Sequence, residues 1–215
     1  MSRYPVPAEE IRREMIVVNS RFIATLAPAF SLEEAREFIN RVRSEFHDAS
    51  HNVPVYLIGH GNSVIAHSSD DGEPSGTAGR PALAVLQGSN LGDVAVVISR
   101  YFGGTKLGTG GLVRAYGDSV RTVVEAVPRA EKVKTHTVMF DIPYRLLERI
   151  RLIAARHQGA ILAEDFAGEV TLTVRFAVES ISGFQEDLKE VTNGSIQAEI
   201  IETQETLMPI RGPAG

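Results

Sequence analysis

The sequence predicts a protein of two α+β domains. Its 215 residues fit one large domain or two small ones. Strand and helix patterns are mixed in the first part of the chain, and a new series in the order β-α-β-β-α-β begins near residue 134 and spans about 75 residues. That order is the ferredoxin-like signature. We therefore expect one domain at 1–132 and a ferredoxin-like domain at 133–215, with the boundary in "PRAEKVK" (128–134).

The first domain opens with a strand pattern and a well-marked helix. Residues 15–29 alternate and are rich in β-branched side chains, which predicts one or two strands. Residues 31–46 predict a helix, because apolar side chains recur at helical spacing. Ser31 stands at its start and Glu34 follows three residues later, which is the pattern of a capping box.

The next elements alternate between strands and helices. Residues 53–59 and 63–68 predict two short strands, and the "GHGN" between them favours a hairpin. Residues 81–89 predict a short helix with Pro81 in its first turn. Residues 93–102 form the most strand-like run and are apolar enough for the centre of a sheet. A long helix over 111–127 follows.

The second domain has clear elements as well. We expect the following strands (β) and helices (α) in chain order: β 135–144, α 145–159, two strands within 160–178 that turn near Ala167 and Gly168, α 180–194 and β 195–203.

Composition limits the classes of function. The chain is 43% hydrophobic and 23% charged, with a mean hydropathy of −0.03, which is typical of a globular protein with a core. A net charge of −5 does not indicate a nucleic-acid binder in bulk. The lack of cysteine excludes disulfides, thiolate metal sites and a cysteine nucleophile. There is no membrane-spanning apolar run and no apolar signal segment, so we expect a cytoplasmic protein with no membrane partner.

The stretch "GGTKLGTGG" (103–111), here called the glycine loop, holds five glycines in nine residues. It is not a P-loop, because Lys106 follows Thr105 instead of glycine and Leu107 comes next. It is not the dinucleotide motif either, because the third glycine of that pattern would fall at Val113. Neither motif therefore predicts a nucleotide cofactor, and we expect none.

The glycine loop lies in a locally basic part of the chain. Residues 99–122 contain four cations and one acid, Asp118, which gives a local charge of +3. Gly110 and Gly111 are expected to open a helix, whose N–H groups and positive end favour anions. Arg100 and Lys106 are expected to be the freer cations. The predicted ligand or nucleic-acid contacts are Arg80, Arg100, Gly103, Gly104, Lys106, Gly110 and Arg114.

A simpler interpretation of the cations stays open. Arg114, Asp118, Arg121 and Glu125 are spaced by four, three and four residues, so they can form a ladder of opposite charges on one solvated helix face. In that case Arg114 and Arg121 balance Asp118 and bind nothing else.

The stretch "SDDGEPSGTAGRP" (69–81), here called the acidic loop, is the second candidate. The residues that suggest function are Asp70, Asp71, Glu73, Ser75 and Thr77. Their spacing does not match an EF-hand, and Ser75 is not in a G-x-S-x-G elbow. The structural alternative is a polar loop in which aspartates cap turns. Its thirteen residues favour function, since long ordered loops tend to be functional. His47 and His51 lie four apart, but at a helix end, so we expect no metal site.

Three stretches in this order resemble the IMPACT family, in particular its bacterial, YigZ-like members: "DASHNVPVYLIG" (48–59), the acidic loop, and "VVISRYFGGTKLGTGGLVRAYGDS" (96–119). The last contains the family signature R-[FYW]-[FYW]-G-G-x-x-L-G. Its positions are filled by Arg100, Tyr101, Phe102, Gly103, Gly104, Leu107 and Gly108. The resemblance is strong up to about residue 130.

The resemblance implies a ribosomal protein S5 domain 2-like fold for the first domain and a ferredoxin-like fold for the second. Eukaryotic relatives regulate translation by binding a ribosome-associated activator of an initiation-factor kinase. The family brings no catalytic residues with it. The resulting prediction is a non-enzymatic binding protein linked to regulation of translation, which contacts RNA or a ribosome-associated partner through a basic glycine-rich surface.

Two alternatives stay open at this stage. The first is an enzyme that binds a small molecule or nucleotide, with the acidic loop facing the glycine loop across a cleft, because S5-like folds also occur in small-molecule kinases. The second is a pure protein–protein interaction module, in which the glycine loop is a structural clasp.

Overall fold

The structure, a computed structural model, describes residues 4–61 and 64–210. The chain divides into two compact units. The second unit comprises residues 132–207, and the first comprises the preceding residues together with the described residues from 208 onward. Both units combine helices with a β-sheet, which confirms the expected two-domain α+β architecture.

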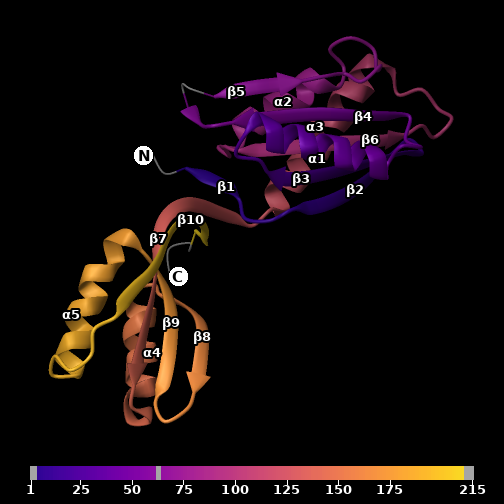
Figure 1. Ribbon diagram of the computed structural model, residues 1–215. Helices are drawn as coiled ribbons and strands as arrows, with labels where there is room; N and C mark the ends of the chain where they lie inside the picture. The colour runs from indigo at the N-terminus through magenta and orange to yellow at the C-terminus, as the bar shows by residue number, and fades with distance from the viewer. Residues whose placement is uncertain (1–3, 62–63, 211–215) are drawn as a thin grey trace. The chain divides into compact units, whose positions relative to one another are not determined.

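The first unit is built on a five-stranded sheet with the order β2-β3-β6-β4-β5 (Figure 1). All of its neighbouring strands are antiparallel. The strands are β2 (Ile11–Val17), β3 (Ser20–Pro28), β4 (His51–Ile58), β5 (Ile65–Ser68) and β6 (Val94–Tyr101). The apolar run predicted to be central is indeed the middle strand, β6. The predicted hairpin of β4 and β5 is present, although residues 62–63 of its turn lie outside the described residues.

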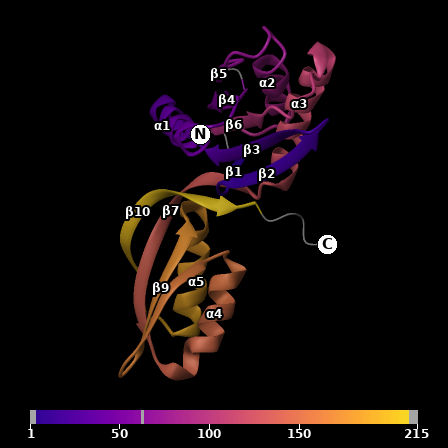
Figure 2. The same cartoon turned by 90° about the vertical axis from the view of Figure 1, so that its right-hand side faces the viewer.

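The helices described in the first unit cover the two faces of this sheet unequally (Figure 2). Helix α1 (Leu32–Glu45) packs on one face, over β4 and β6, where it is the one helix in the described part of the chain. Helices α2 (Gly79–Gly88) and α3 (Gly108–Ala126) pack together on the other face. The core between the sheet and these two helices includes Phe22, Leu86, Ile98 and Tyr116, all fully buried.

The helix starts follow local signals. Ser31 Oγ accepts the backbone N–H of Glu34 (3.1 Å), and the Glu34 carboxylate accepts the N–H of Phe30 (2.9 Å). The capping box is therefore present, with its return bond one residue further back than in the usual pattern. Helix α3 begins at Gly108, so Gly110 and Gly111 lie in its first turn instead of opening it.

The second unit follows the expected element order. Its elements are β7 (Arg129–Ile142), α4 (Leu147–Arg156), β8 (Ala160–Phe166), β9 (Val170–Ala177), α5 (Ile181–Val191) and β10 (Glu199–Pro209), with short 3₁₀ turns at Tyr144–Leu146 and Val178–Ser180. The first three residues of β7 and the last two of β10 belong to the first unit. The strands lie in the order β10-β7-β9-β8. Phe140, Phe176 and Phe184 form its aromatic centre. No helix among the described residues is long and apolar enough to cross a membrane.

The predicted boundary segment 128–134 lies mostly in a strand, and the two compact units divide within it, between residues 131 and 132. It forms the start of β7, where β1 (Pro5–Pro7) pairs with it from Pro7↔Arg129 to Pro5↔Glu131. Ala130 and Val133 are buried, whereas the charged residues beside them are less buried or exposed. The charged residues of this segment therefore occupy the more exposed positions of the strand.

Candidate functional site

The acidic loop is organised around its own first carboxylate. Asp70 accepts three backbone N–H groups, from Gly76 (2.7 Å), Ala78 (3.1 Å) and Gly79 (2.8 Å). Burial by itself raises the pKa of Asp70, but these hydrogen bonds outweigh it and hold the pKa below its usual value. Asp70 thus closes the loop and leads into α2, as in the structural interpretation of this segment.

Asp71 fastens the same loop to α1 and β4. Its carboxylate pairs with Arg43 (2.7 Å) and accepts the backbone N–H of Asn52 (2.6 Å). Its carbonyl oxygen lies 2.7 Å from Nδ1 of His51. The backbone of Asp71 has a φ of 48°, a conformation that aspartate tolerates better than most residues. The loop is therefore held on two sides.

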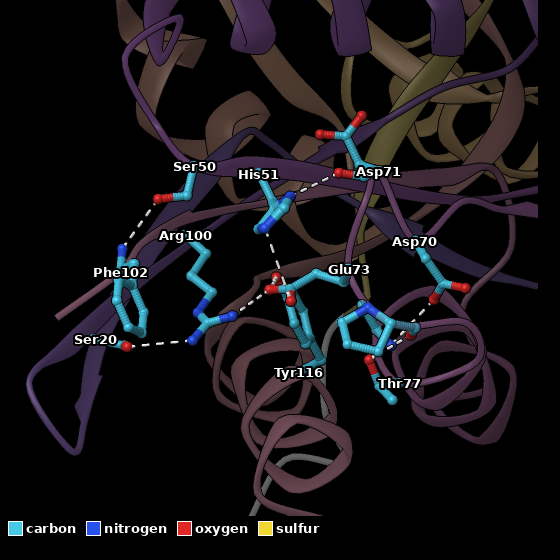
Figure 3. Close-up of polar contacts among 12 residues, drawn as sticks. Ser20, Ser50, His51, Asp70, Asp71, Glu73, Thr77, Arg100, Phe102 and Tyr116 are labelled. Atoms are coloured by element: carbon cyan, nitrogen blue, oxygen red, sulfur yellow. Dashed lines mark hydrogen bonds and ion pairs between the residues drawn. The ribbon is translucent and has the colours of Figure 1, made fainter. Parts of the chain in front are cut away.

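Glu73 lies at the centre of a buried polar cluster (Figure 3). Its Oε1 accepts from Nη1 of Arg100 (2.5 Å) and from the hydroxyl of Tyr116 (2.7 Å), while its Oε2 lies 3.8 Å from Nε2 of His51. Burial, and then the hydrogen bond to Glu73, raise the pKa of Tyr116, so this hydroxyl stays protonated and donates. Glu73, Arg100 and Tyr116 are called the buried clasp below.

The prediction that Arg100 is a free cation is wrong. Arg100 is only 5% exposed, and its guanidinium lies 5.4 Å and 5.7 Å from the ring centroids of Phe22 and Phe102. Its Nε is buried and has no hydrogen-bond partner among the described residues. The side chain lies inside because β6 is the central strand, and a buried guanidinium requires a counter-charge, which Glu73 supplies.

The buried clasp brings the acidic loop to both ends of the glycine loop. Arg100 precedes the glycine loop and Tyr116 follows it on α3. At the start of the glycine loop, Ser20 Oγ accepts the N–H of Gly103 (3.2 Å) and Ser50 Oγ accepts the N–H of Phe102 (3.1 Å). The backbone approach at Gly103 is so close that a Cβ there would lie 2.1 Å from Asn19 backbone atoms. This glycine is required by packing.

The exposed surface next to the clasp keeps a basic character. Lys106 and Arg114 are exposed, as is Arg80 on α2. Helix α3 has no side-chain cap at Leu107 and no acid in its first turn, so its first N–H groups face solvent at its positive end. Phe102 is 50% exposed beside them in the chain. This uncapped helix start, with the glycine loop and its neighbouring cations, is called the α3 surface.

The predicted charge ladder on α3 is present only in part. Arg121 pairs with Asp118. Arg114 forms no ion pair with any residue in the described part of the chain. Of the four cations singled out by the sequence, one is buried, one is paired on the surface, and Lys106 and Arg114 are available to an anion.

The remaining candidates of the acidic loop serve the loop itself or face solvent. The Thr77 hydroxyl donates to the carbonyl of Pro74 (2.7 Å), and Ser75 is exposed. Asp70, Asp71 and Glu73 are all engaged in the contacts above. Within residues 4–61 and 64–210, no three His, Asp or Glu side chains are grouped so that they could hold a metal ion. The geometry therefore gives the acidic loop a structural role. The exposed basic surface next to the buried clasp is the α3 surface.

Comparison with known proteins agrees with the signature in the glycine loop. The Impact N-terminal domain matches residues 18–124, and a domain of unknown function, DUF1949, matches residues 140–195. An IMPACT family member of Haemophilus influenzae is 35% identical over 95% of this chain and 100% of its own length. YigZ of Escherichia coli, also an IMPACT family member, is 34% identical over 94% of this chain and 100% of its own length. The chain belongs to the IMPACT family.

A solved structure supports the same assignment. It is titled only as a hypothetical protein, is 34% identical, and matches 94% of this chain and 98% of its own with a TM-score of 0.60. The two-domain layout is thus shared with a relative along nearly the whole chain.

Gly103→Ala is expected to lower the free energy of unfolding by about 3 kcal/mol or more, because the added methyl group meets the backbone of Asn19. Gly110→Ala is the matched control: its Cβ meets nothing within 4 Å, so this change in a helix should stabilise by about 0.5–1 kcal/mol. Urea unfolding measures both. Equal effects of the two substitutions would contradict the packing argument.

Glu73→Gln is expected to destabilise the protein by about 3–5 kcal/mol, because it leaves the buried guanidinium of Arg100 without a counter-charge. The double variant Glu73→Gln/Arg100→Met removes both charges and should be more stable than the sum of the two single effects implies. Urea unfolding of all four proteins completes the cycle. Additive losses would show that the two charges do not depend on each other.

Asp70→Asn is expected to cost about 1.5–3 kcal/mol near pH 7, where the wild-type carboxylate accepts three N–H groups. Folding lowers the pKa of Asp70. Its contribution to the free energy of unfolding is therefore complete above the pKa of the unfolded state, about 3.9, and is lost as the pH falls through the pKa of the folded state. The difference between wild type and variant should therefore shrink in acid. Melting temperatures from pH 7 to 2.5 test this, with the exposed Asp165→Asn as control.

Proposed function

We propose that this protein is a binding protein linked to regulation of translation, and that it contacts RNA, alone or within a ribosome-associated partner, through the α3 surface. Membership of the IMPACT family supports the link to translation, since the eukaryotic relatives that the sequence resembles act there. The proposed place of action is the cytoplasm, where the translation machinery works.

One observation carries the proposal. Helix α3 starts without a side-chain cap and without an acid in its first turn, and Lys106 and Arg114 are exposed on either side of this start in the sequence. A helix start without a side-chain cap, its positive end and nearby exposed cations together favour a phosphate backbone. The exposed Phe102 adds an aromatic ring on which a base can stack.

The predicted contact set changes in one respect. Arg100 is buried, and its ion pair with Glu73 joins the acidic loop to strand β6 next to the glycine loop. Lys106, Arg114 and Arg80 are the proposed phosphate contacts, and Gly103, Gly104 and Gly110 shape the surface. Contacts of this kind position a nucleic acid without reading its sequence, and they weaken steeply with salt.

We further propose the finer fold assignments. The order β10-β7-β9-β8 with two helices supports a ferredoxin-like second domain, and the family resemblance supports an S5 domain 2-like first domain. The proposed domain limits are 1–132 and 133–215.

Labelled single-stranded and duplex RNA should bind the wild-type protein at low salt, with affinity that falls as salt rises. Lys106→Ala/Arg114→Ala should weaken single-strand binding at least tenfold and reduce the slope of log K against log salt by about 1.4, because two phosphate contacts are lost. Fluorescence anisotropy from 50 to 200 mM KCl is the measurement.

Lys134→Ala/Arg149→Ala is the matched control, since it removes the same charge from exposed positions of the second unit. Its slope should change less than that of the α3 variant. Absence of RNA binding at low salt, or equal effects of the two double variants, would overturn the proposed RNA contact. A partner captured by the wild type and retained after nuclease treatment would then favour a protein contact at the same surface.

A further inference from the structure

The uneven covering of the first sheet leaves a groove. Among the described residues, α1 is the helix that packs on its face of the sheet, over β6 and β4, whereas the edge strand β5 is contacted by α2 from the other face (Figure 2). A groove of about 570 Å³ lies there between α1 and β5. That volume is within the range of small-ligand sites. Its lining residues are Arg36, Ile39, Asn40, Arg43, Pro54, Tyr56, His67 and Ser69.

The α1 wall of this groove is basic. Arg36, Asn40 and Arg43 follow one another at spacings of four and three, so they share one face of the helix. Arg36 is exposed and forms no ion pair within the described residues. Arg43 contacts Asp71 and the carbonyl of Asn52 through Nη2 alone, which leaves other donors of its guanidinium. No carboxylate lines the groove.

The floor of the groove presents an aromatic pair. Tyr56 and His67 are directly opposite each other in the β4–β5 ladder. Their rings are stacked, with centroids 5.1 Å apart and planes at 23°. Tyr56 is buried, whereas His67 is exposed. One face of the His67 ring rests on Tyr56, so its other face can take a further planar ring.

We propose that this groove binds a nucleoside phosphate, with the phosphate at Arg36 and Arg43 and the base stacked on His67. Two arginines suit a phosphate because their planar guanidinium groups donate in pairs. Histidine is among the side chains on which bases stack. The Asn40 amide and the Ser69 hydroxyl supply neutral polar contacts at the edges of the groove.

This site is separate from the α3 surface. The groove lies on the α1 face of the sheet, and α3 packs on the opposite face. The proposal therefore goes beyond the proposed function and does not depend on it. The nucleoside phosphate has two sources: a free mononucleotide, or the phosphorylated end of an RNA.

The test titrates the full chain with AMP, CMP, adenosine and inorganic phosphate, using calorimetry and amide chemical shifts. AMP is expected to bind at least tenfold more tightly than adenosine or phosphate alone, with shifts centred on α1 and β5. Arg36→Gln should weaken AMP at least tenfold. His67→Ala should weaken AMP but leave phosphate unchanged. Both side chains are exposed, so both variants should fold.

Arg41→Gln is the control, since it removes an exposed arginine of the same helix that does not line the groove. It should change AMP affinity less than twofold. AMP binding no tighter than phosphate, an unchanged affinity in Arg36→Gln, or an equal loss in Arg41→Gln would each overturn the proposal.

A second experiment distinguishes a free mononucleotide from the phosphorylated end of an RNA. It uses the Lys106→Ala/Arg114→Ala variant, which lacks the proposed RNA contacts of the α3 surface. A hexanucleotide with a 5′-phosphate that binds more tightly than both AMP and its 5′-hydroxyl counterpart would assign the groove to an RNA end. AMP that binds at least as tightly as the hexanucleotide would assign it to a free mononucleotide.

Discussion

The first unit depends on one buried ion pair, between Glu73 of the acidic loop and Arg100 of the central strand. Neither charge is tolerable alone in this interior, because an unpaired buried charge costs several kcal/mol. Each therefore fixes the other, and Tyr116 adds a hydrogen bond from α3 to the same carboxylate oxygen. A loop, a strand and a helix that are distant in sequence are thereby held in one arrangement.

This arrangement divides the residues of the family signature into two roles. Arg100 and Gly103 act inside: the first as half of the ion pair, the second as the point where the backbone passes against Asn19. The part that follows runs outward into the start of α3, which is left without a cap or an acid. The residues of the signature thus lead into an exposed, positive helix end. Its arginine, Arg100, has a structural role in the core.

The same sheet produces two basic features on opposite faces of a unit in an acidic protein. On one face, α3 begins in the glycine loop without a side-chain cap and without an acid in its first turn. On the other, α1 covers only part of the sheet, and two of its arginines, Arg36 and Arg43, line the groove beside β5. Both features arise from where helices begin or stop covering the sheet, so bulk charge gave no indication of either.

Local patterns in the sequence determined much of the fold. Three predictions rest on patterns inside individual elements, which the sequence shows directly. They are the capping box at Ser31, the central place of β6, and the order of the elements in the second unit. Strand β7 begins at Arg129, six residues before the strand that the sequence predicted from 135, because the charged residues mixed with small apolar ones at 129–134 give no strand pattern. The short strand β1, with two prolines in three residues, gave no strand signal of its own.

Only the tertiary structure decided what the charges do. The sequence identified the acidic loop, the glycine loop and the cations around them as the places of interest. It could not show that Arg100 is buried, or that its partner is Glu73, 27 residues earlier in the chain. Whether a charge is free or paired depends on which side chains meet across the core, and that is set by long-range packing, whereas helices and strands are set mainly by neighbours in the chain.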